Sequence, residues 1–119
     1  MREYLQHYIA GGWVASEGGT RHEVINPATE ESCTAITLGS AADVDKAVAA
    51  ARRAFPAFRH TSVEERLALL ERIAELYKER MADVAAAISE EMGAPISFAL
   101  AAQAPTGLGH FKAAARAPR

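Results

Sequence analysis

The stretch Glu-Val-Ile-Asn-Pro-Ala-Thr-Glu-Glu, residues Glu23–Glu31, decides the fold of this chain. Proline fixes its own φ and disfavours a helical conformation in the residue before it, so Asn26-Pro27 predicts a turn. The flanking segments Arg21–Ile25 and Ser32–Leu38 contain several β-branched residues, which favour an extended backbone. The sequence therefore predicts two strands joined by a turn, a β-hairpin.

An earlier hairpin is predicted closer to the N-terminus. His7–Ala10 and Trp13–Ala15 are expected to be short strands on either side of Gly11-Gly12. Paired glycines accept the positive φ values of a tight two-residue turn, which other residues adopt at a cost.

The first helix is predicted to begin after Ser40. This serine is the expected N-cap, and Asp43 stands three residues later in a position like that of a capping box. The helix is expected to end near Phe55, because Pro56 lacks the N–H that continues a helix. Its narrow apolar face consists of Val44, Ala47, Val48 and Ala51.

A second capping box, Ser62–Glu65, begins a longer helical pattern. Apolar residues then keep the spacing of one helical stripe as far as Met92, so periodicity alone predicts a single helix from Val63 to Met92. That length exceeds the usual range of helices in globular proteins, which leaves one helix or two as open alternatives.

The C-terminal part of the chain is also predicted to be helical. Gly93 suits a left-handed helix end, and Pro95 stops the preceding helix. A short helix is expected over Ile96–Gln103, and a last helix begins around Pro105 and runs to about Arg116.

Composition excludes several classes of function. The chain has 119 residues and a formal net charge of −2, which gives no electrostatic basis for binding nucleic acid or an anionic membrane. No apolar run approaches the roughly 18 residues of a membrane span, and no secretory signal is recognisable. Cys33 is the single cysteine, so no internal disulfide is expected and a reducing cytoplasm is predicted.

Motifs for metal, phosphate or acid–base chemistry are not found. No two of the four histidines have the i, i+4 spacing of helical metal ligands, and no glycine cluster completes Gly-x-Gly-x-x-Gly or a phosphate loop. Glu90 and Glu91 are adjacent on a helix, so their side chains point in different directions and cannot face one substrate atom. The aromatic residues are predicted to pack in the core: Tyr8, Trp13, Phe55, Phe58 and Tyr77.

The order of these segments resembles the start of the aldehyde dehydrogenase superfamily. That family begins with a Tyr-Ile-Gly-Gly-x-Trp-Val strand pair, continues through Val-x-Asn-Pro-Ala-Thr-Gly-Glu, and enters a helix like Asp43–Val48. Tyr8–Val14 and Val24–Thr29 match the first two segments, and Ile88–Pro95 matches a later helix end. Two departures stand out, because Ala10 and Glu30 occupy positions where the family commonly has glycine.

The resemblance implies an α/β parent fold with a Rossmann-type nucleotide-binding domain. Residues 1–119 are expected to be an incomplete N-terminal part of that domain, with the catalytic and oligomerisation domains absent. The segment itself is expected to be α+β, with two N-terminal β-hairpins followed by three to five α-helices. The resemblance also implies a break in the long helix near Glu79–Met81.

Complete members of this family oxidise an aldehyde to a carboxylic acid with NAD⁺ or NADP⁺. A cysteine thiolate attacks the carbonyl carbon, hydride passes to the nicotinamide, and a glutamate helps to activate water. No residue of this chain matches these groups or the coenzyme motifs. Cys33 lies only seven residues after Asn26, far upstream of the family nucleophile, and is expected to be a small packing residue.

The chain alone is accordingly expected to bind no coenzyme and to be inactive. Its expected partner is the remainder of an aldehyde dehydrogenase subunit, and the complete protein is expected to form a homo-oligomer. Two alternatives stay open at this point. One is a stand-alone helical interaction module that buries the Val63–Met92 stripe against a partner. The other is a non-functional truncation with exposed apolar faces.

The resemblance further suggests one metal site. Some family members hold a monovalent cation with backbone carbonyls just before the Asn-Pro turn and with an acidic residue before a Gly-x-Pro helix end. The matching positions here are Val24, Ile25 and Glu91. Carbonyl and carboxylate oxygens are suitable ligands for a hard cation.

Overall fold

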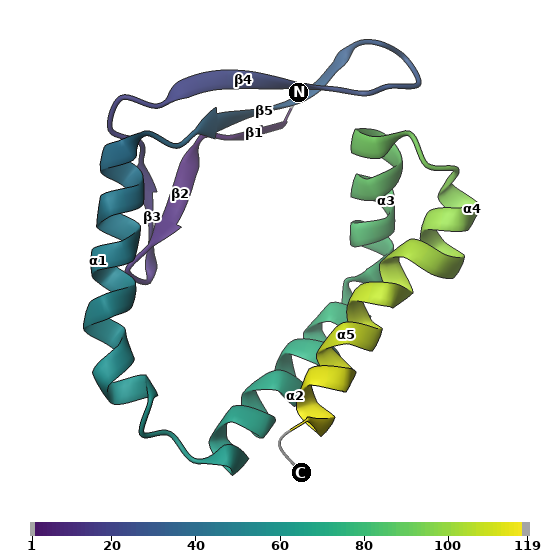
Figure 1. Cartoon of the computed structure of the whole chain (residues 1–119). Coiled ribbons are helices and arrows are strands. Elements are labelled where there is room, and N and C mark those ends of the chain that lie inside the picture. Colours follow the sequence, from purple (N-terminus) through teal and green to yellow (C-terminus); the bar gives the residue numbers. More distant parts are fainter. Residues whose placement is uncertain (1, 118–119) are drawn as a thin grey trace. The chain divides into compact units, whose positions relative to one another are not determined.

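A computed structural model describes residues 2–117 of the chain. These residues form two compact units that divide between His60 and Thr61, and each unit has its own secondary structure. The first contains all the strands and one helix, and the second is helical (Figure 1). The expected α+β organisation, with strands preceding helices, is confirmed.

The strands of the first unit belong to two sheets. One is a three-stranded sheet with the order β1-β5-β4, and the other is the β2–β3 hairpin. β4 pairs antiparallel with β5, as the Asn-Pro turn predicts, whereas the parallel pairing of β1 with β5 was not predicted. The strands are β1 (Arg2–Tyr4), β2 (Gln6–Ile9), β3 (Gly12–Ala15), β4 (Thr20–Ile25) and β5 (Ser32–Leu38).

The loop between β4 and β5 is closed by its own hydrogen bonds. The Asn26 N–H donates to the Glu31 carbonyl at 2.9 Å, and the Glu30 N–H donates to the Asn26 carbonyl at 2.8 Å. The Asn26 side chain accepts from the Ala28 N–H at 2.9 Å, a local contact that favours asparagine in turns. Glu30 has a φ of 60°, so it occupies the left-handed conformation that glycine adopts most readily.

The predicted position of the first turn is wrong by one residue. Its central residues are Ala10 and Gly11, with φ values of 55° and 84°, instead of Gly11 and Gly12. The strand register explains the shift. It places Tyr8 opposite Trp13, and their rings meet edge to face with centroids 5.3 Å apart. A turn at Gly11-Gly12 would break this aromatic pair.

The helix α1 (Ala41–Phe58) begins as predicted, with Ser40 as N-cap and Asp43 completing a capping box. Its predicted end at Phe55 is wrong, because the helix continues through Pro56 to Phe58. Pro56 lies in the last turn, where its missing N–H removes only one helical hydrogen bond. The Arg59 N–H still donates to the Phe55 carbonyl at 2.9 Å, which closes that turn.

The second unit consists of α2 (Val63–Glu79), α3 (Met81–Met92), α4 (Ile96–Phe98), the π-helical turn η1 (Ala99–Gln103) and α5 (Ala104–Arg116). The break implied near Glu79–Met81 is confirmed: Arg80, with φ −103° and ψ 13°, separates α2 from α3. Gly93 ends α3 in the left-handed conformation, as predicted. The last three elements follow one another without an intervening loop.

The second unit is held together by small residues. Ala85, Ala99 and Ala104 form its buried cluster, surrounded by the half-buried side chains of Met81, Val84 and Ile88. α5 packs against α2 (Figure 1), where the Tyr77 hydroxyl donates to the Ala104 carbonyl at 2.9 Å. Tyr77 is half buried and also contacts Phe111, with ring centroids 5.8 Å apart.

Core packing was wrongly predicted for most of the aromatic residues. Tyr8, Trp13, Phe55 and Phe58 are all more than half exposed. Among the described residues, the buried hydrophobic side chains are all alanines, so the chain itself supplies little apolar surface to cover a large ring.

Candidate functional site

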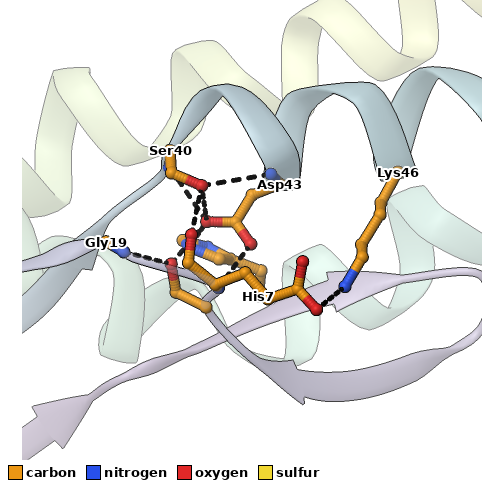
Figure 2. Close-up of polar contacts among 7 residues, drawn as sticks. His7, Gly19, Ser40, Asp43 and Lys46 are labelled. Atoms are coloured by element: carbon orange, nitrogen blue, oxygen red, sulfur yellow. Dashed lines mark hydrogen bonds and ion pairs between the residues drawn. The ribbon is translucent and has the colours of Figure 1, made fainter.

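A polar cluster in the first unit surrounds Asp43, in the first turn of α1 (Figure 2). We name Asp43, Ser16, Glu17 and Ser40 the Asp43 clasp. Asp43 is nearly buried, with 5% of its surface exposed, even though it lies only three residues into a surface helix. A buried carboxylate is costly unless hydrogen bonds replace its water, so its partners determine what it does.

Both carboxylate oxygens of Asp43 accept hydrogen bonds from residues that precede the helix. Oδ2 accepts from the Ser16 hydroxyl and from the Ser40 N–H, the latter at 2.9 Å. Oδ1 accepts from the Glu17 N–H at 2.9 Å. The Ser40 hydroxyl lies 2.5 Å from the Glu17 carbonyl, within hydrogen-bond distance. Glu17, in the loop after β3, therefore donates to the start of α1 through its N–H and accepts from it through its carbonyl.

These donors lower the pKa of Asp43 well below its ordinary value. The hydrogen bond from Ser16 is the largest cause, followed by those from the backbone of Ser40 and Glu17. Each donor stabilises the charged carboxylate, and together they outweigh the effect of burial, which raises the pKa. The group is therefore ionised at neutral pH, and its low basicity makes it unsuitable as a general base.

Two further charged or titratable groups face the clasp. Nε2 of His7, from β2, lies 3.8 Å from Oδ2 of Asp43. Lys46, one turn along α1, lies 2.5 Å from an Oε1 oxygen of Glu17, and both of these side chains are more than half exposed. The exposed pair adds little stability by itself, because water screens it.

Gly19 allows the loop to close. Its N–H donates to the Ser16 hydroxyl oxygen at 3.0 Å. A Cβ at this position would collide with that same oxygen and with the Leu38 carbonyl, which is backbone and cannot move aside cheaply. Because residue 19 is a glycine, its backbone can lie close to the Ser16 hydroxyl and to the Leu38 carbonyl. Ser16 therefore bonds to both Gly19 and Asp43.

The arrangement is structural in character. Its acceptors are satisfied by groups of the chain, and its one strongly shifted carboxylate has too low a pKa for proton transfer near neutral pH. The sequence revealed the Ser40–Asp43 capping box but not Ser16 or Glu17, which are 27 and 26 residues away from Asp43. No local pattern signals such a long-range contact.

The residues considered as sites from the sequence lie elsewhere. Cys33 is half buried on β5, and its thiol lies 3.3 Å from the Val24 carbonyl, to which it donates. Val24 and Ile25 belong to β4 in the first unit and Glu91 to α3 in the second, so the cation site stays a prediction. Within residues 2–117, no group of three or more His, Cys, Asp or Glu side chains is placed to hold a metal ion.

Among residues 2–117, no two parallel strands are joined through a helix. A dinucleotide-binding unit uses that connection, with the phosphates at the N-terminus of the helix. The one parallel pair here, β1 and β5, is connected through β2, β3 and β4 without any helix.

No helix within residues 2–117 is long and apolar enough to cross a membrane.

Comparisons with known proteins agree on one family. The model of the aldehyde dehydrogenase family matches residues 13–119. A curated relative, the 3-succinoylsemialdehyde-pyridine dehydrogenase of a Pseudomonas species, is 50% identical over 116 residues, which is 97% of this chain but 24% of the relative.

Solved structures give the same result. An aldehyde dehydrogenase from Bartonella henselae is 46% identical, with a TM-score of 0.92 over 94% of this chain and 24% of that chain. A mutant aldehyde dehydrogenase C from Pseudomonas syringae, solved with NAD⁺ and octanal, is 48% identical, with a TM-score of 0.90 over 92% of this chain and 23% of that chain. The chain belongs to the aldehyde dehydrogenase family, as an N-terminal segment that spans about a quarter of the length of these relatives.

Proposed function

We propose that this chain forms the N-terminal part of the nucleotide-binding domain of an aldehyde dehydrogenase subunit. The complete subunit oxidises an aldehyde to a carboxylic acid with NAD⁺ or NADP⁺. The observation that carries the proposal is the 50% identity to a curated dehydrogenase over nearly the whole chain, combined with coverage of only 24% of that relative. The role of the segment is to support a catalytic apparatus that residues 2–117 do not contain.

The coenzyme proposal concerns the complete protein. A relative at 48% identity was solved with NAD⁺, which supports a nicotinamide coenzyme for this family member. The strand connections described above lack a dinucleotide-binding unit, so the chain alone is proposed to bind no coenzyme. Calorimetric titration of the purified chain with NAD⁺ is expected to show no saturable heat, and a micromolar dissociation constant would contradict this.

The substrate is proposed only as a class, an aldehyde. Two relatives with nearly equal identity, 50% and 48%, are connected by name or bound ligand with different aldehydes, a pyridine semialdehyde and octanal. Similarity in this segment therefore does not distinguish substrates. The remainder of the subunit is the proposed partner, a homo-oligomer the proposed assembly and the cytoplasm the proposed location.

A chimera tests the proposal directly. The 119 residues of this sequence replace the aligned 116 residues of the Pseudomonas relative, and NADH formation is measured with that enzyme's own aldehyde. The chimera is expected to be active, because the segment is expected to support the same domain. The relative with the aligned residues deleted is the control and is expected to be inactive. A chimera that folds and assembles but forms no NADH would overturn the proposal.

A further inference from the structure

We draw no further inference here: the strongest candidate, the hollow between β2 and α1 where Nε2 of His7 is buried without a hydrogen-bond partner among residues 2–117 and lies 3.8 Å from Oδ2 of Asp43, is part of the polar site around Asp43 already described, and nothing in the structure shows what would occupy it.

Discussion

At the scale of single residues, Asp43 is held by several hydrogen bonds. Its carboxylate accepts from Ser16 and from the backbone of Glu17 and Ser40. Asp43→Asn keeps the size of the side chain but turns an NH₂ group toward groups that are themselves donors. We expect the melting temperature of the chain to fall by several degrees.

The control for this substitution lies two residues further along the helix. Asp45 is exposed, so Asp45→Asn removes the same charge without opening a buried cluster. Its melting temperature, followed by circular dichroism, is expected to stay close to that of the unsubstituted chain. Equal losses in the two variants would mean that net charge, not the clasp, determines the effect.

The clasp also predicts a dependence of stability on pH. The pKa of Asp43 is lowered in the folded chain from an ordinary value of 3.8. A lowered carboxyl pKa contributes stability at any pH above the unfolded value, and this stability is lost as the pH falls toward the folded value. The advantage of the unsubstituted chain over Asp43→Asn should therefore be constant near neutral pH and shrink below about pH 4.

Thermal melts of both proteins between about pH 6 and about pH 2 check this prediction. The other carboxyl groups titrate in both proteins, so the difference between the two curves isolates Asp43. A difference that grows as the pH falls would have the wrong sign and would rule out the clasp as its source.

Glu30 offers a residue-scale test of backbone strain. Its φ of 60° suits glycine, and its side chain is exposed. Glu30→Gly is expected to raise the free energy of unfolding by roughly 0.5–1 kcal/mol, because it removes the left-handed penalty at no cost in contacts. Glu31→Gly, at the next position, has no positive φ to relieve and is expected to destabilise. Urea unfolding of the two variants should give shifts of opposite sign.

At the scale of elements, α2 and α5 meet around one glycine. A Cβ at Gly107 would collide with the ring of Tyr77, whose hydroxyl is held by the Ala104 carbonyl. At Gly109, two residues along the same helix, a Cβ would meet nothing within 4 Å. The two glycines therefore have different roles, although their sequence context is similar.

This contrast gives a prediction with opposite signs. Gly109→Ala is expected to stabilise the chain by about 1 kcal/mol, the usual gain from replacing glycine in an exposed helix. Gly107→Ala is expected to destabilise it by roughly 1–2 kcal/mol, because overpacking against Tyr77 exceeds that gain. Urea unfolding monitored by helical circular dichroism measures both values. Stabilisation by both substitutions would show that α5 does not pack closely on α2.

The elements that could be predicted from the sequence are those with local signals. The capping boxes at Ser40 and Ser62 and the Asn26-Pro27 turn are each complete within a few residues, and all three appear in the structure. Contacts between distant residues gave no such signal. The pairing of β1 with β5 joins Glu3 to Ala35, and the clasp joins Ser16 to Asp43.

Two local predictions failed for a related reason. Glycine content favoured a turn at Gly11-Gly12, but the Tyr8–Trp13 pair fixed the register of the hairpin one residue earlier. The aromatic rings were expected in the core, yet the buried hydrophobic side chains among residues 2–117 are all alanines. In both cases packing determined the outcome, and packing depends on which surfaces are available in three dimensions.

At the scale of the whole molecule, the scarcity of large buried side chains determines how the chain unfolds. Cooperative unfolding requires that much apolar surface become exposed at once, and the urea dependence of the free energy of unfolding scales with that surface. Exposed Trp13, Phe55 and Met92 already contact water in the folded chain. We therefore expect the free energy of unfolding to fall by about 1 kcal/mol or less per molar urea, which is the low end for small proteins.

The same exposure predicts binding of a hydrophobic fluorescent dye by the folded chain. The covalent chimera is the matched comparison, because there the additional protein of the relative is available to cover these side chains. It is expected to bind less dye per copy of the segment and to unfold in a steeper transition. A chain that melts sharply by itself and binds no dye would show that its alanine-rich core is sufficient. The exposed apolar side chains would then be an ordinary solvated surface of the folded chain.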